Sequence, residues 1–94
     1  MIFNWSEAKD EANRRKHRVS FETAQLAFDD PLHVSRQDRV ENGEPRWQTI
    51  GLVRGVLLLL VAHTYTEADG QECVRIISAR KADKTERAIY EQGD

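Results

Sequence analysis

Four residues in the second half of the chain have side chains suited to acting on a phosphate ester. They are Arg46, Arg80, His63 and Glu44. Arginine stays charged, and its planar guanidinium fork matches the oxygens of a phosphate. Histidine and glutamate are side chains that transfer protons in active sites. We therefore take these four as the candidate catalytic residues, provided that the fold brings them to one face.

The turns of the chain predict which of these side chains share a face. Arg54-Gly55 is a tight-turn signal, and a two-residue loop there pairs Val53 with Val56. Counting outward along the two strands then places Arg46 directly opposite His63. We therefore expect these two side chains on the same face of a sheet. The alternative is that they form a structural pair at a sheet rim.

A second hairpin signal extends this register to the last predicted strand. Asp69-Gly70 as a two-residue loop pairs His63 with Ile76. Alternation then puts Arg80 on the face of His63 and Arg75 on the other face. A loop longer by one residue reverses the two arginines, because a one-residue slip moves every side chain to the opposite face.

Other residues are candidates for binding a substrate: Lys16, His17, Arg75, Lys81 and Tyr90. Lys16 and His17 lie at the predicted end of a helix, where the helix dipole favours a cation in any case. Lys81 lies at the end of the last predicted strand. Tyr90 either packs on the sheet or lines the site, and the sequence leaves both open.

Strand signals dominate the second half of the chain. After a weak strand at His33–Gln37, a loop over Glu41–Pro45 places Glu44 where functional residues concentrate. Three stronger strands follow, at Arg46–Val53, Val56–Thr66 and Glu72–Arg80. The second of these is the most apolar, so we expect it at the centre of the sheet.

Helix signals lie on both sides of these strands. Ser6 and Ser20 are good N-caps for helices that run to about Lys16 and to Asp29-Asp30-Pro31, and Asp83 with Glu86 predicts a third start. Phe3–Trp5 reads as a short edge strand. The expected fold is a single α+β domain over residues 1–94, with two N-terminal helices, an antiparallel meander of about four strands and a short C-terminal helix.

The charge distribution is more informative than the total charge. The net charge of −2 and the pI of about 5.9 argue against nucleic-acid binding. Five basic residues nevertheless cluster between Lys9 and Arg18, and five more between Arg75 and Arg87. Such a chain can present a basic face, although each cluster alone could equally be a solvated helix surface.

The composition of the chain bears on which cofactors it could bind and on the cell compartment in which it is expected. Three widely spaced histidines and a single cysteine predict neither a metal site nor a disulfide, so we expect no cofactor. The longest apolar stretch, Val56–Ala62, is far shorter than a membrane span, and the first residues lack the features of a signal peptide. We therefore expect a cytoplasmic protein without a membrane partner.

The motifs, taken in order, resemble one known family. They are Phe3-x-Trp5, Lys9, Asn13, Lys16-His17-x-Val19-Ser20-Phe21, Phe28-x-Asp30-Pro31, Glu44-x-Arg46-Trp47, Val61-x-His63-Thr64-Tyr65, the run Arg75 to Ala82, and Glu86-Arg87-x-x-Tyr90-Glu91. This series is similar to the BrnT family, the toxin half of a bacterial type II toxin–antitoxin pair. Arg18 departs from the glycine expected after the first helix, where a left-handed residue would end it.

The resemblance implies a RelE-like fold, metal-independent endoribonuclease activity that inhibits translation, and neutralisation by a BrnA-type antitoxin. RNA would then be the substrate, and operator DNA would be contacted only through the antitoxin complex. In this setting Arg46 and Arg80 would hold the scissile phosphate, while His63 or Glu44 transfers a proton. The competing hypothesis is a non-catalytic interaction module or DNA-binding co-repressor, which the acidic total charge favours.

Overall fold

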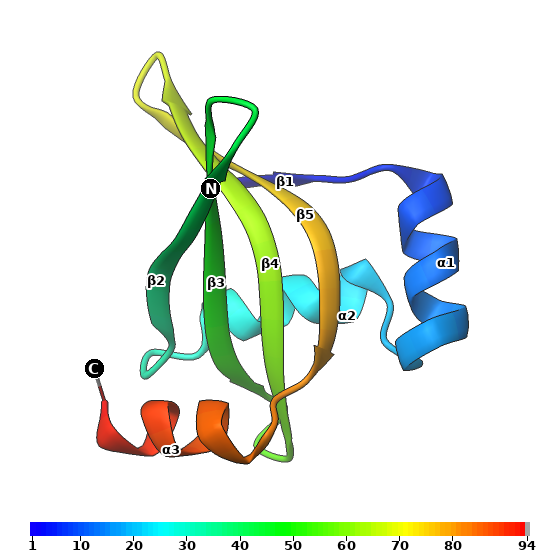
Figure 1. The fold of residues 1–94 in the computed structure, drawn as a ribbon, viewed down its shortest axis with the longest axis vertical. Helices are drawn as coiled ribbons and strands as arrows, with labels where there is room; N and C mark the ends of the chain where they lie inside the picture. Colours follow the sequence, from blue (N-terminus) through cyan, green and yellow to red (C-terminus); the bar gives the residue numbers. More distant parts are fainter. Residues whose placement is uncertain (94) are drawn as a thin grey trace.

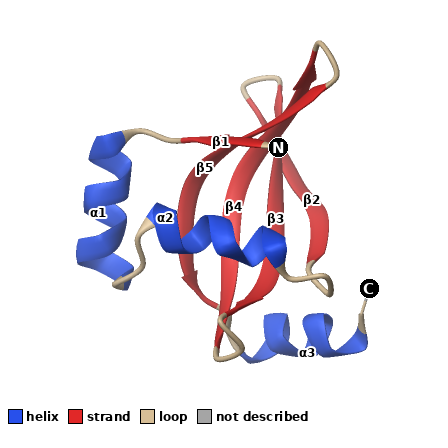
Figure 2. Ribbon diagram, turned by 180° about the vertical axis from the view of Figure 1, so that it is seen from behind, coloured by secondary structure: helices blue, strands red, loops and turns tan. Residues whose placement is uncertain are grey.

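The computed structural model describes residues 1–93 and has one five-stranded sheet with helices on its faces and edge (Figures 1 and 2). The elements are β1 (Ile2–Asn4), α1 (Glu7–His17), α2 (Phe21–Ala24), the 3₁₀ helix η1 (Gln25–Asp29), β2 (Val34–Glu41), β3 (Glu44–Val53), β4 (Leu57–Ala68), β5 (Gln71–Lys81) and α3 (Lys84–Gln92). The order across the sheet is β1-β5-β4-β3-β2. The predicted α+β fold is confirmed.

The sheet has one strand more than the predicted meander. β2 to β5 form that antiparallel meander, and β4 is central, as its apolar sequence predicts. β1 adds a fifth strand that pairs in parallel with the first half of β5, Ile2 opposite Cys73 and Asn4 opposite Arg75. The sheet is therefore mixed. Among the described residues, no helix is long and apolar enough to cross a membrane.

The predicted helix starts are confirmed by their capping bonds. Ser6 Oγ accepts from Lys9 N at 3.3 Å, and Ser20 Oγ accepts from Thr23 N at 3.0 Å. At the end of α1, Arg18 adopts the left-handed conformation usually taken by glycine, with φ of 62°. The left-handed residue expected at the end of this helix is therefore present, but as an arginine, at the cost of some backbone strain.

One face of the sheet is covered by α2 and η1, which Figure 2 shows crossing it. Phe21, Ala24 and Ala27 from this segment are fully buried against β3, β4 and β5. Gly51 of β3 allows this close approach, because a Cβ atom there would overlap the backbone carbonyl of Ala27. The helical segment therefore rests directly on the sheet backbone.

β1 pairs only with the first half of β5, and α1 covers the edge of β5 beyond it. Asn13 of α1 is buried, and its side-chain amide donates to the carbonyl of Ala79 at 2.8 Å and accepts from the Ala79 amide at 3.1 Å. It also donates to the carbonyl of Val19 at 2.8 Å. One amide side chain thus replaces a neighbouring strand and fixes α1 at this edge.

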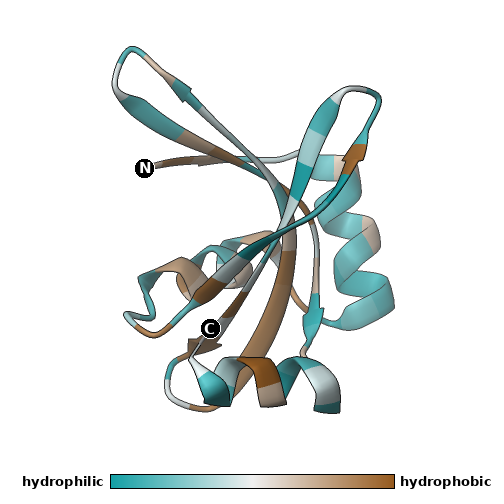
Figure 3. Cartoon of the chain, turned by 60° about the vertical axis from the view of Figure 1, so that its left-hand side comes forward, coloured by the Kyte–Doolittle hydropathy of each residue, from teal (hydrophilic) through white to brown (hydrophobic). Residues whose placement is uncertain are grey.

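The other face of the sheet is covered only at one end, by α3 (Figure 1). Ile89 and Tyr90 pack there against a second apolar cluster of Ile50, Leu58 and Leu60. A capping box between Asp83 and Glu86 begins the helix, as predicted. Figure 3 shows the resulting division, with apolar strand halves near α3 and hydrophilic hairpin tips at the opposite end.

The hairpin turns differ from the prediction by single residues. β2 continues to Glu41, and only Asn42-Gly43 forms the turn that the sequence suggested for Glu41–Pro45. Glu44 therefore begins a strand and does not lie in a loop. At the next turn Val53 pairs with Leu57, so that the loop has three residues and includes Val56. The Asp69-Gly70 turn has two residues, as predicted.

These small differences change which side chains share a face. Because of the longer turn, His63 lies opposite Trp47 and not opposite Arg46. A bulge between Ala62 and His63 then shifts the pairing with β5 by one residue. Leu60 therefore lies opposite Arg80, whereas the predicted register without a bulge would place Leu59 there. The predicted shared face of His63 with the two arginines is therefore wrong.

Candidate active site on the open face of the sheet

The uncovered part of the second face contains a hollow of about 240 Å³. Arg46 and Gln48 of β3 line it, together with Ala62 of β4 and Ser78 and Arg80 of β5. The structure therefore brings together the two arginines that the sequence predicts to bind phosphate. His63 also borders this hollow, but its ring forms its hydrogen bond to Thr49 on the covered face.

Arg80 is held in place by Glu86 of α3. The two guanidinium nitrogens Nη1 and Nη2 donate to Glu86 Oε1 and Oε2, both at 2.8 Å. Glu86 is only 9% exposed, and the hydrogen bonds from Arg80 lower the pKa of its carboxyl group despite burial. It also accepts from the Asp83 amide, within the capping box. The carboxylate of Glu86 therefore both caps the start of α3 and fixes the orientation of Arg80.

Arg46 is held more loosely, by two carboxylates. Its guanidinium nitrogens lie 3.4 Å from Glu41 and 3.7 Å from Glu44, and the side chain is 20% exposed. Its Nε atom is buried and has no hydrogen-bond partner among residues 1–93. A buried donor without an acceptor is costly, so this atom favours the binding of an additional oxygen.

Arg75 joins this cluster from β5. Its Nη2 atom donates to Glu44 Oε1 at 2.9 Å, so that Glu44 bridges Arg75 and Arg46. The predicted placement of Arg75 and Arg80 on opposite faces is wrong, because the bulge in the β4–β5 pairing falls between them. Both arginines lie on the open face.

His63 is placed on the face covered by α2 and η1, where it is 2% exposed. Its Nδ1 atom lies 2.9 Å from the carbonyl of Thr64 and must carry the proton, because a carbonyl only accepts. Nε2 then accepts from Thr49 Oγ1 at 2.7 Å. Burial lowers the pKa of His63, so that the ring is neutral at pH 7. The role of His63 in proton transfer, which the sequence suggested, stays a prediction.

Lys16 and His17 border a second hollow of about 270 Å³ beside the first. Ile77 and Ser78 line both hollows, so that the end of α1 adjoins the arginine site across β5. Lys81 is exposed at the end of β5. The structure thus gathers most of the predicted substrate-binding residues around one surface.

Tyr90 has a partner within the fold. Its hydroxyl donates to Asp30 Oδ2 at 2.6 Å, and its ring packs on the apolar cluster beneath α3. The same carboxylate oxygen accepts from the Leu52 amide, and these bonds outweigh burial and lower the pKa of Asp30. Asp30 in turn raises the pKa of Tyr90 to about 12. Of the two roles left open by the sequence, packing on the sheet is the one observed.

Sequence reasoning missed Glu86 as part of the site. The signal was present, since Asp83-x-x-Glu86 predicts a capping box, but nothing in that spacing indicates that Glu86 also binds Arg80. Among residues 1–93, no group of three or more His, Cys, Asp or Glu side chains is placed to hold a metal ion.

This arrangement can bind a phosphate between two arginines that approach from different strands. Arg80 would offer an oriented guanidinium, and Arg46 an unpartnered Nε–H donor. Glu44, 3.7 Å from Arg46 Nε, is a carboxylate that could exchange a proton there.

Comparisons with known proteins identify the family of this chain and support its fold. A family described as the ribonuclease toxin BrnT of type II toxin–antitoxin systems matches residues 5–86. The crystal structure of the Brucella abortus ribonuclease toxin BrnT has the same fold, with a TM-score of 0.63 and 24% identity over 89% of this chain and 100% of that one. A search of curated proteins gave no match. The chain therefore belongs to the BrnT family of ribonuclease toxins from type II toxin–antitoxin systems.

Proposed function

We propose that this chain is an endoribonuclease that cleaves RNA without a metal ion, at the hollow between Arg46 and Arg80. The observation that carries the proposal is the buried, unpartnered Nε atom of Arg46, in the same hollow as an arginine that Glu86 holds in one orientation. Two guanidinium cations can stabilise the charge that develops on a phosphorane, which is the role a metal ion has in other nucleases.

Binding of RNA requires a phosphate to displace carboxylates from Arg46. Glu41 and Glu44 are 44% and 39% exposed and lie more than 3 Å from the guanidinium, so these ion pairs contribute little. A phosphate can therefore take their place at small cost. Arg80 keeps Glu86, because that pair is closer, bidentate and more buried.

Glu44 keeps its hydrogen bond from Arg75 and is the proton acceptor in this proposal. It takes the proton from the ribose 2′-OH, the 2′-oxygen forms a bond to phosphorus, and the bond from phosphorus to the 5′-oxygen breaks. The leaving 5′-oxygen takes up the proton that Glu44 gives back through solvent, and a 2′,3′-cyclic phosphate remains. Lys16 and His17, beside the adjoining hollow, would bind the neighbouring phosphates of the strand.

Cleavage of messenger RNA would inhibit translation, and a BrnA-type antitoxin would silence the enzyme. Membership of a type II toxin family implies an antitoxin partner. Acidic side chains of that partner could occupy the arginine hollow in place of RNA. Operator DNA would be bound through the antitoxin and not by this chain.

The direct test is cleavage of a defined RNA by the purified protein in EDTA, with the antitoxin added in a second arm. We expect the same rate in EDTA and in magnesium, and loss of cleavage with the antitoxin. A strong loss in EDTA would contradict the metal-free mechanism. No cleavage in any buffer, combined with DNA binding by the complex alone, would instead support the non-catalytic co-repressor, which the net charge of −2 favours.

A further inference from the structure

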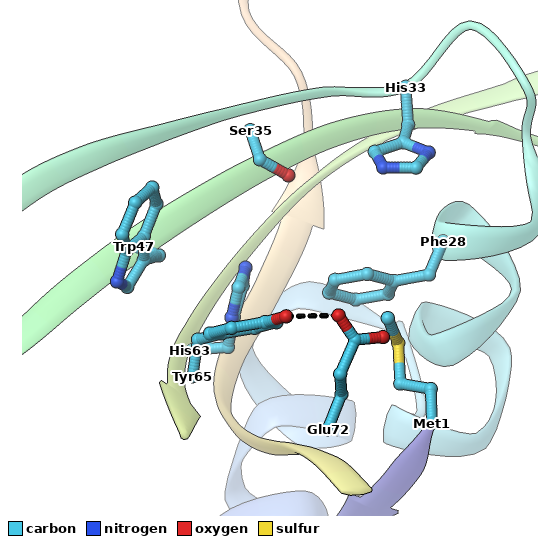
Figure 4. A pocket seen from close by; sticks show the side chains of 8 residues that line it. All are labelled: Met1, Phe28, His33, Ser35, Trp47, His63, Tyr65 and Glu72. Carbon is cyan, nitrogen blue, oxygen red and sulfur yellow. Dashed lines mark hydrogen bonds between the residues drawn. The ribbon is translucent and has the colours of Figure 1, made fainter. Parts of the chain in front are cut away.

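A pocket of about 330 Å³ lies on the covered face of the sheet, and Trp47 and His63 line both this pocket and the arginine hollow. Figure 4 shows Trp47 at one end and Phe28 at the other, with Tyr65 and Glu72 along one side and Ser35 and His33 along the opposite side. The centroids of Trp47 and Tyr65 are 6.4 Å apart. The pocket is thus walled by aromatic rings that β3, β4 and η1 contribute.

Three polar side chains of the wall, Glu72, His33 and Ser35, present hydrogen-bond acceptors. Tyr65 donates its hydroxyl hydrogen to Glu72 Oε2, which leaves Oε1 without a hydrogen bond among the described residues. His33 Nδ1 lies 2.7 Å from the carbonyl of Asp30, and in the tautomer with the proton on Nδ1 the other ring nitrogen, Nε2, accepts.

Ser35 also presents an acceptor, because a chain of hydrogen bonds fixes its hydroxyl. His63 Nε2 accepts from Thr49, as its protonated Nδ1 requires, and Thr49 Oγ1 must therefore accept from Ser35 Oγ at 2.7 Å. The lone pairs of Ser35 Oγ remain. A ligand that only donates hydrogen bonds is the one that satisfies Glu72, His33 and Ser35 together.

Charge around the pocket selects a cation. Glu72 lines the pocket, and the β4–β5 hairpin tip beside it carries Glu67 and Asp69 and no basic residue. Aromatic rings with a nearby carboxylate attract a cation through their negative faces. The phosphates of an RNA strand would be repelled by these carboxylates, which argues against a nucleobase as the occupant.

We propose that this pocket is a docking site for an arginine side chain of a partner polypeptide, and that the partner is the antitoxin implied by the family. The guanidinium is planar, carries five donors and no acceptor, and stacks on aromatic rings, so that it can lie on the face of one ring of the wall with its edge toward Glu72. The proposal rests on the antitoxin partnership and not on catalysis.

The test uses the full chain and two short peptides, acetyl-Leu-Arg-Leu-amide and the same peptide with citrulline in place of arginine. Citrulline keeps the shape and loses the charge. The readout is the indole N–H signal of Trp47 in an NMR titration, with Trp5 as an internal control, because Trp5 packs on Phe21 outside the pocket. We expect the arginine peptide to bind about tenfold more tightly and to shift Trp47 alone.

Two variants locate the site. E72Q should reduce binding of the arginine peptide about fivefold to tenfold and leave citrulline binding and RNA cleavage unchanged. E91Q is the control: it removes an exposed carboxylate from α3 and should change neither peptide binding nor RNA cleavage. If E72Q fails to fold, the comparison of the two peptides on the unaltered chain still decides the matter.

Three outcomes would overturn the proposal. One is equal binding of the two peptides, and another is the absence of any Trp47 shift at millimolar peptide. The third is a Trp47 shift caused by guanosine 5′-monophosphate and not by the arginine peptide, which would make the pocket a nucleobase site. If R46A loses RNA cleavage but still binds the arginine peptide, the docking pocket works independently of the proposed active site.

Discussion

The two faces of the sheet use the same kinds of side chain in different ways. Asn13 at the edge of β5 and Thr49 and His63 on the covered face are buried, and each makes hydrogen bonds to protein atoms at 2.7–3.1 Å. On the open face, Arg46 and Glu44 are partly exposed and lie 3.7 Å apart. Buried polar groups must have fixed partners, whereas partners at a surface can be exchanged.

Arg80 lies between these two cases. It faces the open hollow and is 38% exposed, but its partner Glu86, in the first turn of α3, is only 9% exposed. The hydrogen bonds that Arg80 donates to Glu86 raise the pKa of Arg80 above its already high value, so that the guanidinium keeps its charge at any working pH. We therefore propose that the open face is the reactive one, and each prediction below tests that division.

The largest expected effect is on catalysis at the open face. R46A should slow RNA cleavage by about 100-fold to 1000-fold, because it removes a group that stabilises charge in the transition state. R54A is the matched control, since Arg54 lies in the β3–β4 turn, roughly 25 Å further along the strand. Both proteins should show the circular dichroism and melting temperature of the parent. Parental cleavage by R46A would place the active site elsewhere, and the adjoining Lys16 and His17 would be examined first.

On the covered face, the largest effect should be on stability. G51A should lower the free energy of unfolding by about 3 kcal/mol, because the new methyl group overlaps the Ala27 carbonyl and η1 must move. Denaturant unfolding followed by tryptophan fluorescence measures this loss. Gly43 is the control, since a Cβ atom there meets no other atom within 4 Å, although its φ of 77° adds some strain. If G51A and G43A unfold at the same denaturant concentration, the close contact is unimportant.

His63 connects stability to pH. Its pKa is lowered in the folded state, so the unfolded chain binds a proton at a higher pH, near 6.5. Stability should therefore be complete above pH 6.5 and fall as the pH drops below it, by at most about 1.4 kcal/mol per pH unit. H63Q should lose this slope and still cleave RNA at pH 7.5, while the exposed variant H33Q should keep the slope. Abolished cleavage in a folded H63Q protein would support the catalytic role predicted from the sequence.

Local signals predicted the elements well. Ser6, Ser20 and Asp83 start helices as expected, and the apolar run beginning at Leu57 forms the central strand. These features depend on neighbouring residues in the sequence, so they can be read from it directly. The α+β fold and the family followed from them and from the motif series.

The arrangement of the site could not be read in the same way, because single residues decide it. Val56 joins a turn that could equally have had two residues, and the bulge near His63 has no distinctive sequence. Each moves side chains to the opposite face. The parallel pairing of β1 and the bridge from Asn13 to Ala79 are contacts between distant segments, for which one sequence carries no signal.

The smallest effect should come from a change at Tyr90, whose ring packs beneath α3 and whose hydroxyl is bound to Asp30. Y90F removes one hydrogen bond to Asp30, whose Oδ2 atom keeps the Leu52 amide as a donor, so we expect a loss of about 1 kcal/mol in the free energy of unfolding. RNA cleavage should stay within about twofold of the parent rate, since a change of that size corresponds to less than 0.5 kcal/mol in the barrier. A cleavage rate that falls tenfold in Y90F at unchanged stability would show that its hydroxyl contacts the RNA, and the active surface would then extend from the arginine hollow beneath α3.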